Sequence, residues 1–158
     1  AMDESRRFRP EDFITREEFL KLLLESLELT KVQGECEFSD VSREDWFYLY
    51  VASAVELEIC KGQGDGTFGA GETITRQDMA VMVQRAADAA GLALEAGEPD
   101  FTDKDTISDY AKDAAGAMLQ ANIISGVGEG RFAPLEKATR AQAAKIIDAL
   151  RSLYVSQR

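Results

Sequence analysis

The stretch Phe68-Gly-Ala-Gly-Glu-Thr-Ile-Thr75-Arg76 decides the fold, because the chain contains three copies of it. The other copies are Phe8-Arg-Pro-Glu-Asp-Phe-Ile-Thr15-Arg16 and Phe132-Ala-Pro-Leu-Glu-Lys-Ala-Thr139-Arg140. In each copy a phenylalanine precedes, by eight residues, an arginine that directly follows a threonine. A motif that recurs at this spacing indicates a tandem repeat, in which neighbouring units stack to bury a common core.

Two further landmarks recur in two copies only. Phe38-Ser-Asp40 matches Phe101-Thr-Asp103, and the glycine turn from Gly62 to Gly66 matches the one from Gly126 to Gly130. The sequence therefore predicts three units, of which the first is only a C-terminal half. The expected boundaries are 1–33 for this partial repeat, 34–96 for the second repeat and 97–158 for the third.

The sequence of each complete unit predicts two helices joined by short turns and extended segments, so we expect the fold class to be all-α. Helical apolar spacing places the first helix of the unit at about 47–59 and 110–124. The second helix begins at the Thr-Arg pair, where a capping box is expected three times, as Thr15 with Glu18, Thr75 with Asp78 and Thr139 with Gln142.

Composition excludes several classes of function. The 158 residues include 18 Lys and Arg, 29 Asp and Glu, and no histidine, which gives a net charge of −11. Such an acidic chain is a poor nucleic-acid binder, and it has no histidine for a catalytic triad or a zinc site. A membrane span of about 18 apolar residues is absent, so membrane insertion is not expected. We expect no metal and no cofactor. Whether Cys36 and Cys60 pair stays open, because the helix expected between them would hold them apart unless the chain doubles back.

The motif arginines Arg16, Arg76 and Arg140 stand at the first position of the second helix, where the helix dipole disfavours a cation. Two interpretations are open. The guanidinium could pair with an acidic neighbour and stack on the phenylalanine of its repeat, or it could join free helix amides in an anion site.

Two aromatic residues and the glycine turns also leave alternatives open. Trp46 and Tyr110 occupy equivalent positions at the start of the first helix, where an aromatic ring either fills the core or grips a sugar. The turn Gly62-Gln-Gly-Asp-Gly66 lacks the further residues of a nucleotide-binding loop. Only Asp65 would fit a calcium loop, so calcium is not expected either.

The set Phe38-Ser-Asp-Val41, Trp46, Gly62-Gln-Gly-Asp-Gly-Thr-Phe68 and Ile74-Thr-Arg-Gln-Asp78 resembles an S-layer homology repeat. The resemblance covers nearly the whole chain. It implies a pseudo-threefold, three-pronged helical bundle whose grooves bind a secondary cell-wall polysaccharide that is often pyruvylated. It further implies a non-catalytic anchor at the bacterial cell surface. The alternative is a helical protein-interaction module that binds no glycan.

The resemblance also implies a set of ligand-binding residues, with the site around Arg76 expected to be the most complete. They are Arg16, Arg76, Arg140, Trp46, Tyr110, Gly64, Asp65, Gly66, Gly128 and Gly130. Because the first unit lacks its first helix, one apolar stripe of the last helix should have no partner and should favour a homodimer. That stripe is Ala143, Ile146, Ile147, Leu150 and Tyr154.

Overall fold

The computed structural model describes residues 9–30 and 34–157 and confirms an all-α fold. Within these ranges the chain forms helices and turns and no named strand, and a single 3₁₀ helix, η2, spans Lys104–Thr106. The α-helices are α1 (Arg16–Ser26), α2 (Tyr48–Glu56), α3 (Arg76–Ala89), α4 (Asp109–Gln120) and α5 (Arg140–Ser156).

The first helix of each complete repeat is shorter than predicted, because it ends before the glycine turn. After α2 the chain enters the left-handed region at Glu58, with φ of 61°, and after α4 it does so at Asn122, with φ of 58°. A residue in this conformation cannot continue a helix. The glycine turns therefore shape the loop that follows and do not end the helix.

The three motif segments join in a closed ring at the centre of the molecule. The amide of Ile14 donates to the carbonyl of Ala138, that of Ala138 donates to Ile74, and that of Ile74 donates to Ile14, at 3.1, 2.9 and 3.2 Å. Antiparallel bridges flank each contact. The ring relates the three repeats by a pseudo-threefold axis, and it makes the first repeat a direct neighbour of the third.

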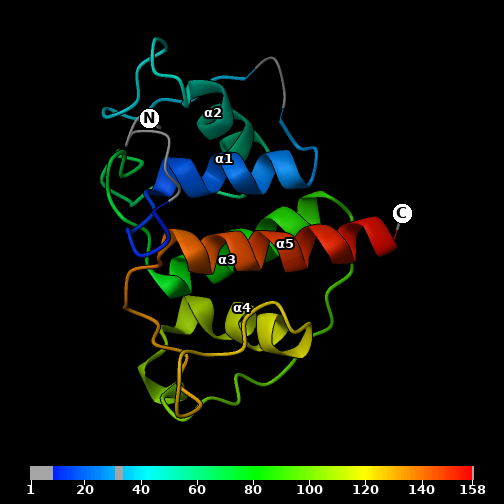
Figure 1. Ribbon diagram of the computed structural model, residues 1–158. Helices are drawn as coiled ribbons and strands as arrows, with labels where there is room; N and C mark the ends of the chain where they lie inside the picture. Colours follow the sequence, from blue (N-terminus) through cyan, green and yellow to red (C-terminus); the bar gives the residue numbers. More distant parts are fainter. Residues whose placement is uncertain (1–8, 31–33, 158) are drawn as a thin grey trace, which may run out of the picture.

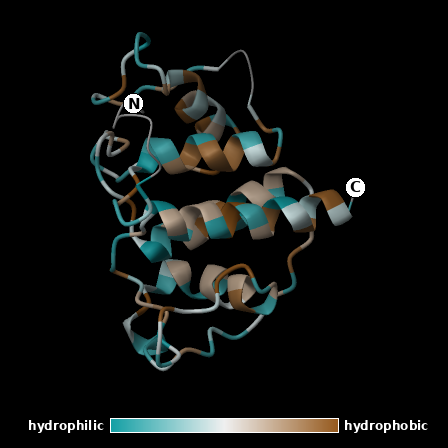
Figure 2. Cartoon of the chain, viewed as in Figure 1, coloured by the Kyte–Doolittle hydropathy of each residue, from teal (hydrophilic) through white to brown (hydrophobic). Residues whose placement is uncertain are grey.

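The second helices α1, α3 and α5 start at this ring and run side by side, and the first helices pack on their outer sides. Figure 1 shows α2 beside α1, and α4 beyond α3 and α5. Leucine and phenylalanine give α1 its strongly apolar section in Figure 2, whereas α4 is paler because alanine dominates its buried face. Large fully buried side chains, among them Phe19, Phe68 and Phe132, fill the space between helices and loops.

The expectation of an exposed apolar stripe on α5 is wrong for three of its five residues. Ala143, Ile146 and Leu150 are at most 4% exposed, because this side of α5 faces the interior of the bundle. Ile147 and Tyr154 are partly buried. The open face of α5 is the adjacent one, which carries Ala144 and Asp148, both exposed.

Candidate functional site

One groove at a repeat junction combines parts of all three repeats. Arg16 comes from the first repeat, the start of the glycine turn and the α3 side chains come from the second, and Tyr110 comes from the third. The cavity measures about 340 Å³. We call it the Arg16 groove; its lining residues are Arg16, Ile59, Cys60, Lys61, Gly62, Gln63, Asp78, Val81, Met82, Arg85 and Tyr110.

Pseudo-symmetry repeats this arrangement at two other junctions. The Arg76 groove is smaller, about 90 Å³, and is lined by Arg76, Ile123, Ile124, Ser125, Gly126, Val127, Gln142, Lys145 and Ile146. The Arg140 groove measures about 290 Å³ and is lined by Ile14, Glu18, Lys21, Leu22, Trp46 and Arg140. Trp46 therefore lies with Arg140 and Tyr110 with Arg16. The expectation that the most complete site surrounds Arg76 is not met, because its groove is the smallest and no Trp or Tyr lines it.

Two motif arginines tie one repeat to the next. Arg16 Nε donates to the carbonyl of Phe68 at 3.0 Å, and its guanidinium lies over the Phe68 ring at 5.3 Å. Arg76 makes the same pair of contacts with Phe132, at 2.8 and 5.6 Å. Both arginines are more than nine-tenths buried. The predicted stacking is thus present, but on the phenylalanine of the following repeat.

The helix amides expected to join an anion site are already bonded. The amides of Arg16, Arg76 and Arg140 donate to the carbonyls of Glu72, Glu136 and Asp12, at 2.8–2.9 Å. The amides of the third helical residues donate to the capping threonine hydroxyls. This part of the anion-site interpretation is wrong, because these helix amides are not free to bind an anion.

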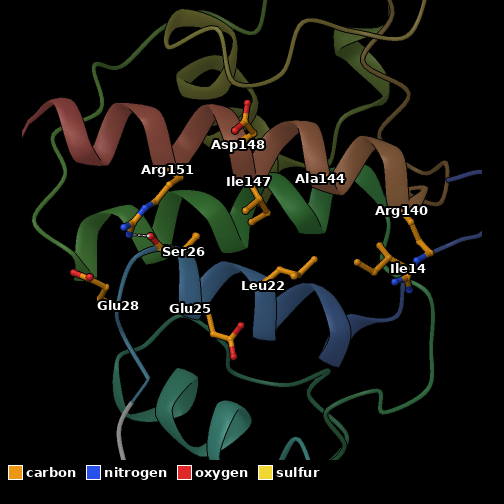
Figure 3. Close-up of a pocket in the computed structure, with 10 residues that line it drawn as sticks. All are labelled: Ile14, Leu22, Glu25, Ser26, Glu28, Arg140, Ala144, Ile147, Asp148 and Arg151. Carbon is orange, nitrogen blue, oxygen red and sulfur yellow. Dashed lines mark hydrogen bonds between the residues drawn. The ribbon is translucent and has the colours of Figure 1, made fainter. Parts of the chain in front are cut away.

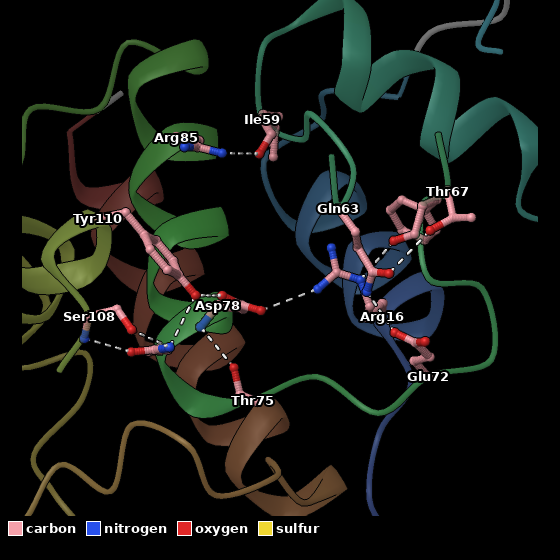
Figure 4. A network of polar contacts seen from close by, with 12 residues as sticks. Arg16, Ile59, Gln63, Thr67, Glu72, Thr75, Asp78, Arg85, Ser108 and Tyr110 are labelled. Carbon is pink, nitrogen blue, oxygen red and sulfur yellow. Dashed lines mark hydrogen bonds and ion pairs between the residues drawn. The ribbon is translucent and has the colours of Figure 1, made fainter. Parts of the chain in front are cut away.

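The third residue of each second helix lies beside the motif arginine of a different repeat and determines the charge next to that arginine. Glu18 pairs with Arg140 at 2.8 Å, and Asp78 lies 3.5 Å from Arg16. Glu18 also completes a capping box with Thr15, as Gln142 does with Thr139. The box predicted for Asp78 is incomplete: the shorter side chain does not bond back to Thr75 and instead points into the groove (Figure 4).

Arg76 differs from its two counterparts because the neutral Gln142 replaces the carboxylate. Among the described residues no carboxylate lies within ion-pair distance of Arg76. Burial lowers the pKa of its guanidinium, while the more distant charges of Glu136 and Asp103 raise it. Lys145 lines the same cavity. The Arg76 groove therefore presents a desolvated positive charge.

Both candidate aromatic residues are exposed, so neither is a core residue. The Tyr110 side chain spans the Arg16 groove, where its hydroxyl donates to Asp78 Oδ1 at 2.5 Å and accepts from Gln77 Nε2 at 3.1 Å. Desolvation and the bond to Asp78 raise its pKa to about 12, so it stays protonated at neutral pH. Trp46, 57% exposed, packs edge-on against Phe47 and Tyr50.

The remaining predicted residues lie outside the lining of the cavities. They are Gly64, Asp65, Gly66, Gly128 and Gly130. The Asp65 carboxylate accepts bonds from the amide and hydroxyl of Thr67, so it stabilises the turn itself. Four cations that were not predicted from the sequence also line the grooves, Lys61 and Arg85 in the Arg16 groove, Lys21 in the Arg140 groove and Lys145 in the Arg76 groove. Lys61 stands next to the turn. The others follow the third residue of their helix (Glu18, Asp78 or Gln142) by three or seven positions, which places them on the same helix face as that residue.

The acidic loops have a structural role that the sequence did not suggest. The Asp40 carboxylate accepts bonds from the amides of Phe68, Gly69 and Ala70 at 2.8–2.9 Å. Asp103 does the same for Phe132 and Ala133. Burial alone would raise the pKa of each carboxyl, but these bonds lower it. The loops thereby hold the carbonyls that bind Arg16 and Arg76.

The described residues show neither a membrane helix nor a metal cluster. Within 9–30 and 34–157 no helix has the length and apolarity of a membrane span. No three cysteine, aspartate or glutamate side chains of this part of the chain are placed to hold a metal ion. Cys36 and Cys60 are free thiols.

Comparison with known proteins yields one family and several multidomain relatives. The family model described as S-layer homology domain matches residues 3–20, 37–80 and 100–144. An endoglucanase of Bacillus sp. (strain KSM-635) is 33% identical over 90% of this chain. The surface-layer 125 kDa protein of Lysinibacillus sphaericus is 29% identical over 81%, and a cellulosome-anchoring protein of Acetivibrio thermocellus 24% over 89%. The chain spans 15%, 10% and 32% of these relatives, respectively.

Proposed function

Since this chain belongs to the S-layer homology domain family, we propose that it anchors a surface protein to the bacterial cell wall by binding a secondary wall polysaccharide. Relatives named as a surface-layer protein and as a cellulosome-anchoring protein support a cell-wall anchoring module located at the cell surface. We further propose that the polysaccharide is pyruvylated and that it binds in the grooves at the repeat junctions.

The Arg16 groove is the observation that carries this proposal. Its volume of about 340 Å³ falls within the range of small-molecule sites. The cations Arg16, Lys61 and Arg85 outnumber the single carboxylate Asp78, and the exposed Tyr110 ring offers a flat apolar face. A positive, aromatic-walled groove of this size suits one acidic sugar unit.

The Arg76 groove suits a smaller anionic group. At about 90 Å³ it is too small for a sugar ring, but Arg76 and Lys145 face no carboxylate within ion-pair distance among the described residues. The carboxylate of a ketal-linked pyruvate is a group of this kind. Recognition by buried guanidinium groups acts at short range inside the groove, whereas salt screens the repulsion between an acidic polymer and the net charge of −11 beyond a Debye length of about 8 Å.

A non-catalytic role is part of the proposal. The carboxylates that line the grooves are engaged, Asp78 by Arg16 and Tyr110 and Glu18 by Arg140. They are therefore poorly placed to act as a general acid and base. Enzymatic activity of a parent protein would lie in other domains.

Co-sedimentation with purified cell-wall sacculi tests the proposal. Intact sacculi should retain the chain, and sacculi stripped of secondary polymer should not. Tyr110→Ala and the double variant Lys61→Ala/Arg85→Ala should weaken retention, because these side chains line the Arg16 groove, and circular dichroism checks that each variant is folded. Lys104→Ala, in η2 and away from the groove lining, is the matched control. Equal retention by stripped sacculi, or unchanged retention of both groove variants, would refute the proposal.

A protein-interaction module is the second candidate, and one observation favours it. A cleft of about 670 Å³ between α1 and α5 is largely apolar and does not contain the Arg16 or Arg76 side chains (Figure 3). It adjoins the Arg140 groove, with which it shares Ile14, Leu22 and Arg140.

A further inference from the structure

Gln77 is a buried polar residue whose side chain bonds to the start of a helix in a different repeat. It directly follows Arg76 on α3 and is 4% exposed. Its Oε1 accepts from the amide of Ser108 at 3.0 Å, and its Nε2 donates to the hydroxyls of Ser108 and Tyr110, each at 3.1 Å. The orientation of the Gln77 amide is fixed, because the backbone N–H of Ser108 can only donate and must face the oxygen. Gln77 thereby joins the start of α3 to the start of α4.

The Tyr110 hydroxyl is held from two sides by consecutive residues of α3. It accepts from Gln77 and donates its single proton to Asp78 Oδ1 at 2.5 Å. The other oxygen of that carboxylate, Oδ2, lies 3.5 Å from Arg16 Nη1. A continuous polar chain therefore runs from the buried Gln77 through Tyr110 and Asp78 to Arg16 (Figure 4). Because the hydroxyl proton is used within this chain, the exposed ring is the main contact surface that Tyr110 offers.

Two residues at this junction give up helix-capping bonds to make the arrangement. Ser108 is the N-cap residue of α4, but its hydroxyl makes no capping bond and instead accepts from Gln77. Asp78 is the third residue of α3, but its carboxylate leaves the capping box incomplete and accepts from Tyr110. Capping bonds stabilise helix ends, so their absence at two neighbouring helix starts indicates that the contacts to Tyr110 serve another purpose.

The counterparts of Gln77 in the other repeats make no such clamp. On α1 the equivalent residue is Glu17, whose carboxylate oxygens accept from the amide of Gly71 at 2.8 and 3.0 Å. On α5 the equivalent residue is Ala141, which has no polar side chain. The clamp on an aromatic residue is therefore specific to the Arg16 groove.

The aromatic residues of the two larger grooves are accordingly held in different ways. Trp46, the counterpart of Tyr110, packs its ring edge-on against Phe47 and Tyr50. Tyr110 is attached through the tip of its side chain, by the bonds of Gln77 and Asp78. The orientation of the Tyr110 ring therefore depends on hydrogen bonds to its hydroxyl.

We propose that Gln77 is a positioning residue, which holds the Tyr110 ring across the Arg16 groove so that a sugar unit stacks on the ring while its acidic group meets Arg16. The inference rests on the proposed function, because the ligand is the wall polymer. A ring that is already oriented loses less conformational freedom on binding, so the clamp raises affinity. It also selects a sugar that presents a flat apolar face beside its negatively charged group.

The orientation of Tyr110 can be measured without any ligand. Three-bond NMR couplings across χ1 report whether a side chain occupies one rotamer or averages over several. We expect one rotamer in the parent chain and averaged couplings in Gln77→Met, which keeps the length of the side chain but removes its amide. Gln120→Met, at an exposed position of α4, is the matched control and should keep the parent couplings. A single Tyr110 rotamer in folded Gln77→Met would overturn the inference.

Calorimetry with the purified wall polymer measures the effect on affinity. Gln77→Met and Tyr110→Phe should each weaken binding about three- to tenfold, since both remove the bond that holds the ring. The double variant should bind no more weakly than either single variant, because both changes release the same ring. Additive losses would contradict the inference. Unchanged affinity of Tyr110→Phe would also overturn it, whether or not Gln77→Met folds.

Failure of the proposed function gives a different result. No binding of the polymer by the parent chain would refute that function and, with it, the contribution of the clamp to affinity. The couplings of Tyr110 in the free chain would then still decide whether Gln77 positions the ring.

Discussion

Replacing Asp78 with asparagine should strengthen binding of an acidic wall polymer, because Asp78 competes with the ligand for Arg16. The Asp78 carboxylate lies 3.5 Å from Arg16 Nη1 and accepts the Tyr110 hydroxyl bond. Asparagine removes the negative charge but keeps an oxygen that can accept from Tyr110. The bond from the Asp78 amide to Thr75 involves only the backbone of residue 78, so the helix start is retained.

The expected magnitude follows from this geometry. Two unit charges 3.5 Å apart interact by about 5 kcal/mol at an effective dielectric constant of about 20. The Asp78 side chain is 32% exposed, and measured values for such partly exposed pairs are nearer 1 kcal/mol. Relief of this competition should therefore raise the affinity for an anionic ligand about five- to tenfold.

Isothermal titration calorimetry with solubilised, purified secondary wall polymer is the appropriate assay. Asp88→Asn is the matched control, because it removes the same charge from an exposed site on the same helix, outside the groove lining. The gain shown by Asp78→Asn should exceed that of the control and shrink as salt increases. An unchanged or weaker affinity for Asp78→Asn would refute the reasoning, since Asp78 would then contact the sugar itself or the ligand would lie elsewhere.

Three other predictions concern stability and the Arg140 groove. Asp40→Asn should lower the free energy of unfolding at neutral pH by about 2 kcal/mol, because its carboxylate accepts three backbone bonds. Since these bonds lower the folded-state pKa of Asp40, its contribution is present above the unfolded pKa and is lost as pH falls through the folded pKa. The difference between variant and parent in urea denaturation should therefore shrink in acid, and a constant difference would contradict this account. Gly116→Ala should lower the melting temperature sharply, because its Cβ would lie 1.9 Å from the Gly97 carbonyl oxygen; an unchanged transition in calorimetry would rule out that contact. Trp46 is the sole tryptophan, so a shift in its emission on adding polymer should report occupancy of the Arg140 groove, and an unshifted spectrum at saturation would show that this groove stays empty.

The sequence predicts local features of this fold well, because they depend on neighbouring residues. The starts of α1, α3 and α5 follow from the Thr-Arg pair, and the capping boxes of Thr15 and Thr139 depend only on residues three apart. The box at Thr75 is incomplete because the shorter Asp78 side chain points into the groove.

The grooves could not be assembled from the sequence, because they depend on closure of the ring. In the sequence, Trp46 belongs to the same repeat as Arg76. Closure of the ring of motif segments instead places Trp46 beside Arg140 of the third repeat. For the same reason the stacking partner of Arg16 is Phe68, which lies 52 residues away. Likewise, Asp40 looks like a solvated loop residue until the loop that begins at Phe68 folds onto it.

The ring of backbone bonds also determines how the molecule bears mechanical load. The first and last repeats are joined directly, through the bonds from Ile14 to Ala138 and from Arg140 to Asp12. A pull on these two repeats therefore loads this short seam directly, and the longer path through the middle repeat, which is bonded to both, shares the load. The sequence on either side of the seam, residues 12–14 and 138–140, is consequently where we expect mechanical strength to be set.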